Sequence, residues 1–393
     1  MSGVVTLHAK ASQLARKQHP WFYADDLADV DAPDVAIVRV RDDRGRDLGL
    51  GFLSTPSRLR LRLCGPWPDS PSVPTPDEFF AKRLEQAVAM RGATTAANAA
   101  MRVVHGEADG LPGLVVDRYG EGFVLQSSST VVERHLDSIV PWLARNGAAF
   151  VLARNDVGAR KFESLPEEVR LLHGRRVDTV VVDEDGVRAT ARIWTGHKTG
   201  LYLDQRPARR RVRELAAGRA VLDLFAYQGG FSIAAAVGGA TSVLAVDQSA
   251  DALAQAQLDA TANGVTSITM QVGNAFDVVR DLRRDERMFD LVVVDPPAFC
   301  KSRRELAGGL RGYRDLNRAA VRLLAPGGWL VTCSCSHHLS WEMFEDVMRQ
   351  SAADVPFRLL LRERIMAGAD HPAWVSLPES EYLKVLVLQR SGT

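Results

Sequence analysis

The C-terminal half of the chain alternates short apolar runs with helical segments. The apolar runs are AVLDLF, SVLAVD, ITMQVG, FDLVVVD and GGWLVTCS. Short runs of this kind are typical of parallel strands that are covered by helices on both faces. We therefore predict a Rossmann-like α/β domain over residues 191–393.

The first part of the chain has a different pattern, in which apolar and charged residues alternate around Asp and Gly turns. This alternation predicts a small β-rich domain over residues 1–70. In the stretch SRLRLRLC, an extended strand would place Arg58, Arg60 and Arg62 on one face and three leucines on the other. That basic face is either a solvated surface or an edge that contacts phosphates.

A proline-rich segment, residues 64–80, follows this domain. Its five prolines disfavour both helix and sheet and predict a semi-rigid linker. The linker ends in a helix start, with Thr75 as N-cap, Pro76 at the first helical position and Glu78 completing a capping box. The residues that then fall on one helical face are Phe79, Phe80, Leu84 and Val88.

Residues 71–190 mix helical segments with strands such as GLVVDRYGEGFVLQ and AAFVLARN. This mixture predicts a middle α/β domain. At its end, VVVDEDGVRATARIW predicts a hairpin that leads into the C-terminal domain.

Composition and charge narrow the class of protein. With 393 residues, 46% of them hydrophobic and 25% charged, the chain is expected to be globular with two or three domains. The net charge of +1 gives no global attraction to nucleic acid, so an RNA partner must meet local basic surfaces. The candidate basic stretches are LARKQHP, PSRLRLRL and RPARRRVR.

Neither a secretory signal nor a membrane span is expected. The most apolar stretch, VLDLFAYQGGFSIAAAVGGATSVLAV, is interrupted by Asp223, Gln228 and a Gly-Gly pair, and a buried strand–turn–helix–strand explains it better. The four cysteines make no disulfide framework, which suits a reducing cytoplasm.

Two acids at successive strand ends predict a nucleoside site. Asp223 ends the first strand of the domain, and Asp247 ends the next strand 24 residues later, a spacing suited to binding ribose hydroxyls. The turn AYQGG does not match the GxGxxG turn that holds a pyrophosphate, which favours S-adenosylmethionine over a dinucleotide. Asn274, after the third strand, is placed to bond the adenine edge. The alternative is that both acids merely cap strand ends.

The fourth strand ends in Asp295-Pro296-Pro297, a rigid extended corner at the ligand-binding edge of the sheet. Many methyltransferases use such a corner to bind a planar substrate that carries an amine. The carboxylate would accept from the amine, and Phe299 would stack on the ring.

The fifth strand ends in Cys333 and Cys335, on one face of the strand and next to Asp295. A thiolate there suits carbon methylation of a pyrimidine, which needs a nucleophile at C6. The alternatives are small buried hydrophobes, or a metal site with His337 and His338, which would be a poor tetrahedral set. Cys335 is favoured because it lies further along the strand.

Together these residues resemble the large-subunit ribosomal RNA methyltransferase I family. These enzymes are S-adenosylmethionine-dependent cytosine-C5 methyltransferases with an N-terminal PUA domain. The likeness runs over nearly the full length, through HPWFYADDL, HGEADGLPGLVVDRYG, RNDVGARKFESL, GHKTGLYLDQR, LDLFAYQGGFS, VVDPPAFCKS, RGYRDLN, SCS and YLKVLVLQ.

The resemblance implies a class I methyltransferase domain at the C-terminus, a middle RNA-contacting domain and an RNA-binding PUA module. It also implies 23S ribosomal RNA as substrate; we expect no membrane partner and allow for a homodimer. The nucleophile maps to Cys335 and the acid of the corner to Asp295. The positions that we expect at the cofactor are Gln205, Arg206, Asp223, Phe225, Tyr227, Gly229, Asp247, Asn274 and Asp295.

Three features depart from the family pattern. Cys300 follows the Asp-Pro-Pro corner, where some other RNA cytosine-C5 enzymes keep a cysteine, so it competes with Cys335 as nucleophile. Asn274 replaces a common Asp, and His337 and His338 have no functional explanation. Two other functions stay open: methylation of an exocyclic amine of a purine in RNA, and a non-catalytic RNA-binding assembly factor.

Overall fold

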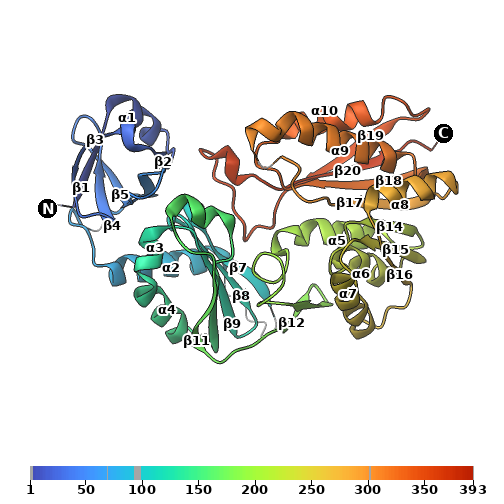
Figure 1. Cartoon of the computed structure of the whole chain (residues 1–393), viewed down its shortest axis with the longest axis horizontal. Helices are drawn as coiled ribbons and strands as arrows, with labels where there is room; N and C mark the ends of the chain where they lie inside the picture. Colours follow the sequence, from blue (N-terminus) through green and yellow to red (C-terminus); the bar gives the residue numbers. More distant parts are fainter. Residues whose placement is uncertain (1–2, 69, 93–98, 301, 393) are drawn as a thin grey trace. The chain divides into compact units, whose positions relative to one another are not determined.

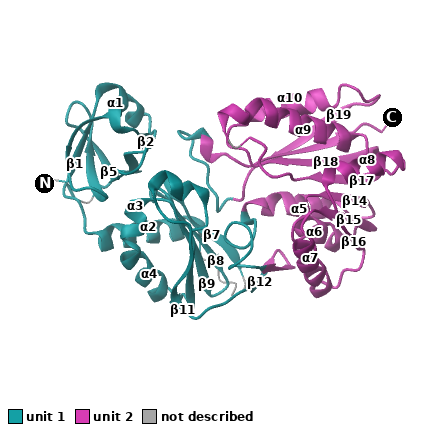
Figure 2. Ribbon diagram, viewed as in Figure 1, with its two compact units in different colours: residues 1–182, 191–203, 369–378 teal, residues 183–190, 204–368, 379–393 magenta. Residues whose placement is uncertain are grey.

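The computed structural model describes residues 3–68, 70–92, 99–300 and 302–392. Residue 69, within the proline-rich segment, lies outside them. The chain forms two compact units, which Figure 2 shows in different colours. Unit 1 comprises residues 1–182, 191–203 and 369–378, and unit 2 comprises residues 183–190, 204–368 and 379–393.

Unit 1 begins with a six-stranded sheet in the order β2-β6-β5-β4-β1-β3 (Figure 1). Its elements are β1 (Val4–Leu7), α1 (Ala9–Arg16), β2 (Trp21–Phe22), β3 (Leu27–Asp31), β4 (Ala36–Arg41), β5 (Asp47–Leu53) and β6 (Leu61–Gly65). Apolar side chains such as Val38, Val40 and Leu61 are fully buried in its core. The predicted β-rich fold of this part is confirmed.

The basic stretch before and in β6 differs from the prediction. β6 begins only at Leu61, so Arg58 and Arg60 precede the strand. Arg62 is mostly buried and pairs with Glu163 at 2.6 Å. The expectation of three arginines along one strand face is therefore wrong. The strand begins after Arg60, and Arg62 is paired with the buried carboxylate of Glu163.

A second sheet in unit 1 has five strands in the order β11-β10-β9-β8-β7. Its strands are β7 (Ala100–His105), β8 (Leu114–Tyr119), β9 (Gly122–Ser127), β10 (Phe150–Arg154) and β11 (Val169–Gly174). The helices of this part are α2 (Pro76–Arg91), α3 (Thr130–Arg134) and α4 (Leu136–Arg145). The predicted mixture of helices and strands is confirmed.

Helix α2 begins as predicted, with Thr75 and Glu78 forming a reciprocal capping box. Phe79, Phe80 and Leu84 are buried on one face. Val88, which was expected to share that face, is 41% exposed, and Ala87 is buried instead. The prediction for Val88 is wrong because the buried face runs one residue earlier in the last turns of the helix.

Buried charged groups tie distant segments into unit 1. Arg102 pairs with Asp117 at 2.8 Å, and the hydroxyl of Thr199 donates to the other oxygen of Asp117. The backbone N–H of Arg102 donates to Asp370 at 3.0 Å. These bonds explain why the segments around Thr199 and Asp370 belong to the same unit as the second sheet.

Unit 2 is built on a seven-stranded sheet in the order β16-β15-β14-β17-β18-β20-β19. The parallel strands are β14 (Ala220–Leu224), β15 (Ser242–Asp247), β16 (Ile268–Val272), β17 (Phe289–Val294) and β18 (Leu324–Ser334). All five strands predicted from the apolar runs are therefore confirmed. The remaining strands, β19 (Leu359–Ile365) and β20 (Lys384–Arg390), are antiparallel and had not been predicted.

Helices cover both faces of this sheet (Figure 1). Side chains of α8 (Ala275–Arg284), α9 (Leu306–Val321) and α10 (Trp341–Ser351) fill the core on one face. The core on the other face includes α5 (Arg206–Leu215) and α6 (Gly230–Val237), and α7 (Ala250–Ala262) contacts α6. The predicted hairpin is present as β12 (Val180–Glu184) and β13 (Val187–Ala191). Short 3-10 helices lie at Ala24–Asp26, Gly106–Asp109, Gly158–Glu163, Leu203–Gln205, Arg303–Glu305 and Pro378–Ser380.

The arginines of α5, in the stretch RPARRRVR, do not form the free basic patch that was predicted. Glu184 lies 2.5 Å from Arg209, and Asp185 lies 2.7 Å from Arg210. Arg211 pairs with acids as well. Acidic neighbours therefore offset much of the charge of this helix. Within the described ranges, no helix has the length and apolar character needed to span a membrane.

Candidate active site

The carboxyl ends of the parallel strands gather the predicted site residues of unit 2 at one edge of the sheet. Asp223 lies in β14, Asp247 ends β15, Asp295 follows β17 and Cys335 follows β18. Parallel strands place their carboxyl ends together, which is why residues far apart in sequence meet here. Because β14 pairs with β15 on one side and with β17 on the other, Asp223, Asp247 and Asp295 lie at neighbouring strand ends.

Asp223 is fully buried, and its Oδ2 accepts a hydrogen bond from Ser232 Oγ at 2.6 Å. Burial raises the pKa of this carboxyl to about 7, and the negative charges of Asp295 and Asp247 add to that rise. The bond from Ser232 acts in the opposite direction. A positively charged partner would therefore stabilise the ionised form of Asp223.

Asp247 holds the turn after β14. Its carboxylate accepts the backbone N–H of Tyr227 at 2.8 Å and that of Ser249 at 2.8 Å. A carboxylate offers about four lone-pair sites, so these two bonds leave capacity for ribose hydroxyls. Capping and ligand binding are therefore compatible at this residue.

The turn itself is strained. Phe225 and Tyr227 have φ angles of 65° and 49°, and Gly229 has a φ of 72°. A side chain at Gly229 would also place its Cβ 2.9 Å from the Cβ of Ala256. Non-glycine residues in the left-handed region concentrate at ligand-binding turns, where the surrounding structure enforces them.

Asn274 is exposed and caps α8, because its Oδ1 accepts the N–H of Phe276 at 2.9 Å. Arg206 points its guanidinium toward Glu184, at 3.8 Å. Asn274 thus bonds the first turn of its own helix, and Arg206 lies near an acid of the β12–β13 hairpin.

Gln205, by contrast, lies at the site. Its Nε2 donates to both carboxylate oxygens of Asp295, at 3.1 Å each. The residue is 3% exposed, yet its Oε1 has no hydrogen-bond partner among the described residues.

Other buried polar atoms at this edge also lack partners within the described chain. They are Oδ1 of Asp223 and both amide atoms of Gln228, a residue that sequence reasoning missed. Buried polar groups are normally satisfied, so such a group indicates a missing ligand or water. Polar atoms beside clustered carboxyls fit a polar, positively charged ligand such as S-adenosylmethionine, with its ammonium and sulfonium groups. Gln228 stands in the AYQGG turn, and that position was the signal that could have revealed it.

The cysteines differ sharply in exposure. Cys64, Cys300 and Cys333 are buried, whereas Cys335 is partly exposed. Burial and the neighbouring Asp295 carboxylate raise the pKa of Cys333 well above its usual value. As strand alternation predicted, Cys333 and Cys335 lie on the same face, against the core that includes α5.

Cys300 belongs to the core on the other face of the sheet. Burial raises the pKa of its thiol, which contacts the carbonyl of Leu306 at 3.9 Å. A Cβ on Gly309 would lie 2.2 Å from its sulfur. Cys300 therefore fills a tight contact with α9.

Tyr313 of α9 is a second residue that sequence reasoning missed, although the run RGYRDLN contains it. Its hydroxyl accepts from Ser334 Oγ and contacts Ser336 Oγ, at 3.0 Å each. These serines flank Cys335, so Tyr313 fixes the backbone on both sides of the thiol. The ring of Phe299 packs on Tyr313 with centroids 4.8 Å apart, so one side of the expected stacking ring is already occupied.

His337 has a structural explanation. Its ring lies 5.4 Å from that of Tyr382, and its Nδ1 lies 3.1 Å from the carbonyl oxygen of Glu379. Among the residues that the structure describes, no cluster of His, Cys, Asp or Glu could hold a metal ion.

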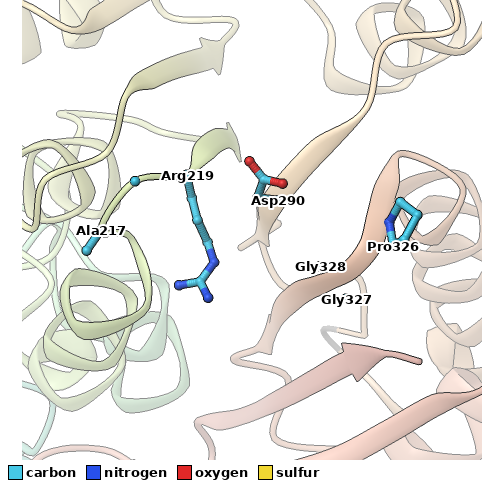
Figure 3. A pocket seen from close by; sticks show the side chains of 7 residues that line it. Ala217, Arg219, Asp290, Pro326, Gly327 and Gly328 are labelled. Carbon is cyan, nitrogen blue, oxygen red and sulfur yellow. The ribbon is translucent and has the colours of Figure 1, made fainter. Parts of the chain in front are cut away.

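A pocket lies near the opposite, amino-terminal ends of β14 and β17 (Figure 3). Its lining includes Arg219, Asp290 and residues 326–328 near the start of β18. Asp290 accepts the N–H of Ala220 at 2.9 Å, which is a structural role. The pocket contains none of the predicted site residues.

Comparison with known proteins identifies the two recognisable parts of the chain. A family model for S-adenosylmethionine-dependent methyltransferases matches residues 123–376, and a model for PUA-like domains matches residues 5–64. Two solved structures share the fold at 21% identity: the crystal structure of SMU.776 in complex with SAH (TM-score 0.84) and a protein from Streptococcus mutans that is described as a SAM-dependent methyltransferase (TM-score 0.82). Each is matched over 99% of its length and covers 98% of this chain.

Curated relatives match over the whole length. The ribosomal RNA large subunit methyltransferase I of Tolumonas auensis is 35% identical over 99% of this chain and 100% of its own length. The protein of the same name from Photobacterium profundum is 35% identical over 94% of each chain. The predictions of S-adenosylmethionine as cofactor, of the PUA-like domain and of the methyltransferase fold are confirmed. The chain therefore belongs to the ribosomal RNA large subunit methyltransferase I family of S-adenosylmethionine-dependent methyltransferases.

Proposed function

We propose that this enzyme transfers a methyl group to C5 of a cytosine in large-subunit ribosomal RNA, through a covalent bond between Cys335 and C6. The name of the relatives supports the class of RNA. The observation that carries the chemistry is the exposure of the thiols. Of the four, Cys335 alone is not buried, and it follows the strand next to the one that leads to Asp295.

In this mechanism the thiolate of Cys335 adds to C6, forms the C6–S bond and leaves an electron pair at C5. A protonated Asp295 would donate to N3 of the cytosine and accept from its N4 amine, which draws electron density away from C6. When bound, S-adenosylmethionine supplies the methyl group that C5 takes up as the bond from the sulfonium sulfur to the methyl carbon breaks. Loss of the C5 proton to a base and cleavage of the C6–S bond then return Cys335 as a thiolate.

The acids at the sheet edge would each bind a different part of S-adenosylmethionine. Asp247 would accept from the ribose hydroxyls, and buried Asp223 would face the positive charge of the methionine part. Asn274 would bond the adenine edge, while the turn with Phe225, Tyr227 and Gly229 lets backbone approach the ligand. Gln205 would orient Asp295 through its two hydrogen bonds.

The RNA-contacting surfaces are assigned to the PUA-like part, proposed as residues 1–70, and to the middle part, proposed as residues 71–190. The methyltransferase part is proposed as residues 191–393. A target base must leave its stack to reach a thiol at a sheet edge, so single-stranded or loosely paired RNA is the expected substrate.

The test uses ribosomal RNA from cells that lack this protein, incubated with the enzyme and with S-adenosylmethionine labelled in its methyl group. We expect label on C5 of a cytosine in the large-subunit RNA, and none with the Cys335→Ala variant. Label on an exocyclic amine of a purine would overturn the proposal, and so would full activity of Cys335→Ala.

A further inference from the structure

Lys384 is a buried lysine that the proposed mechanism does not use. It is the first residue of β20, a strand that is otherwise apolar in its first half, and it is 3% exposed. Lysine is almost never fully buried unless its charge is paired, because taking an ammonium out of water is costly. A lysine at this place therefore calls for a specific partner.

Topology places Lys384 at the same edge of the sheet as the proposed nucleophile. Because β20 is antiparallel to β18, its first residue lies at the edge where β18 ends. Lys384 is directly opposite Ser334, the residue before Cys335. No other lysine that the structure describes in unit 2 lies at this edge, since the remaining described lysines belong to unit 1.

The ammonium is also fixed in position. Its Nζ donates to the carbonyl oxygens of Glu381 and Tyr382, at 2.9 and 3.0 Å. Burial lowers the pKa of Lys384 to about 8, and the negative charges of Glu381 and Cys335 oppose that fall. The charged form of Lys384 and the thiolate form of Cys335 therefore favour each other.

We propose that Lys384 is a positioning residue that favours the thiolate form of Cys335 and holds the Glu381–Tyr382 backbone beside it. The use of this thiolate for methylation rests on the function proposed above. A neighbouring Lys is a recognised way to make a cysteine reactive near neutral pH. Because a lysine of lowered pKa loses its charge as the pH rises through about 8, its effect is strongest below that value.

Other titratable groups around this corner come from several elements. They are Tyr313 of α9, Asp295 after β17, Cys333 of β18, His337 after β18, His338 after β18 and Glu381 before β20. Asp295 acts on the buried thiol of Cys333, and the pKa of Tyr313 is raised to about 12 by burial. Tyr313 is therefore neutral near pH 7, whereas Lys384 and Cys335 interact electrostatically.

The test is the alkylation of the full-length protein by iodoacetamide, followed at Cys335 by mass spectrometry as a function of pH. We expect a midpoint below the ordinary value of about 8.5. Lys384→Met should lower the rate near neutral pH on the order of tenfold, and Lys384→Arg should restore most of it. Lys161→Met removes an exposed lysine of unit 1 and should leave the rate unchanged.

A wild-type midpoint at or above about 8.5 would overturn the proposal without reference to any variant. An unchanged rate in a Lys384→Met protein that melts like the wild type would do the same. Alkylation needs no RNA, so its outcome is independent of the methylation assay. If the alkylation midpoint is shifted but no methylation is detected, the proposed role of Lys384 stands and the proposed methylation of cytosine is wrong.

Discussion

At the scale of single residues, burial distinguishes side chains that the sequence leaves equivalent. Cys300, Cys333 and Cys335 all stand near the Asp-Pro-Pro corner, but only Cys335 is partly exposed. A buried thiol has a raised pKa and resists ionisation, so it is a poor nucleophile. The same reasoning explains Asp223, because burial raises the pKa of its carboxyl to about 7 and the carboxyl is mostly protonated below that pH.

The raised pKa of Asp223 predicts how S-adenosylmethionine affinity depends on pH. In the unliganded protein the carboxyl has a pKa of about 7, well above that of an unfolded chain, so folded stability falls as the pH rises toward 7. A positively charged ligand favours the ionised form, so binding below pH 7 should release a proton. Affinity should therefore increase as the pH rises from about 5 to about 7.

Titration calorimetry in buffers of different ionisation enthalpy measures this proton release directly. The Asp223→Asn variant, which cannot ionise, should bind more weakly and release fewer protons. Equal proton release by the variant and the wild type would assign the effect to another group.

Tyr313→Phe tests whether methylation requires the hydrogen bonds between the Tyr313 hydroxyl and the serines on either side of Cys335. The change leaves the ring contact with Phe299 but leaves the hydroxyls of Ser334 and Ser336 without their tyrosine partner. The free energy of unfolding should fall by about 1–3 kcal/mol. The kcat for methylation should also fall, while S-adenosylmethionine affinity stays the same. A normal kcat in a destabilised variant would limit Tyr313 to a structural role.

At the scale of elements, the lack of a side chain at Gly309 allows α9 to pack closely against the corner after β17. A Cβ at Gly309 would lie 2.2 Å from Cys300 Sγ and 2.8 Å from the carbonyl oxygen of Phe299. Gly309→Ala should therefore destabilise the protein by about 1–3 kcal/mol in chemical denaturation.

The adjacent Gly308 is the matched control, because a Cβ there would meet only the far end of Arg311, at 4.0 Å. Gly308→Ala should stabilise the protein by up to about 1 kcal/mol through helix propensity. Equal effects at the two glycines would show that close packing of α9 is unimportant.

The sequence predicted the parallel strands and the acids at their ends well, because apolar runs and strand-end positions depend on local pattern. It did not predict the antiparallel pair of β19 and β20, although that pair brings Lys384 to the site. The contacts of Tyr313 and the pairing of Arg62 were also missed. All of these depend on partners distant in the chain, which neither periodicity nor motif spacing reveals.

At the scale of the whole molecule, many of the basic side chains form ion pairs with acidic side chains of the same chain. Of the three basic stretches expected to meet RNA, α5 is largely offset by acids, and Arg16 in LARKQHP pairs with Asp42 at 2.8 Å. RNA binding is thus expected to use fewer free charges than the sequence indicates.

The salt dependence of RNA affinity measures how many basic side chains are available to contact RNA phosphates. Affinity for ribosomal RNA should fall at least roughly tenfold between about 50 and about 200 mM salt, because phosphate contacts release counterions. S-adenosylmethionine affinity should change much less over that range. If RNA binding were as insensitive to salt as cofactor binding, contact with the RNA backbone would not be the basis of recognition.

The covalent role of Cys335 is tested most directly by capturing the intermediate on RNA that contains 5-fluorocytosine. Fluorine at C5 cannot leave as a proton, so a Cys335–C6 adduct formed during methyl transfer should persist through denaturing electrophoresis. We predict an adduct with the wild type and with Cys300→Ala, appreciable adduct with Cys333→Ala, and none with Cys335→Ala. An adduct that survives in Cys335→Ala and disappears in Cys300→Ala would contradict this prediction, as would a wild-type enzyme that methylates ribosomal RNA and never forms the adduct.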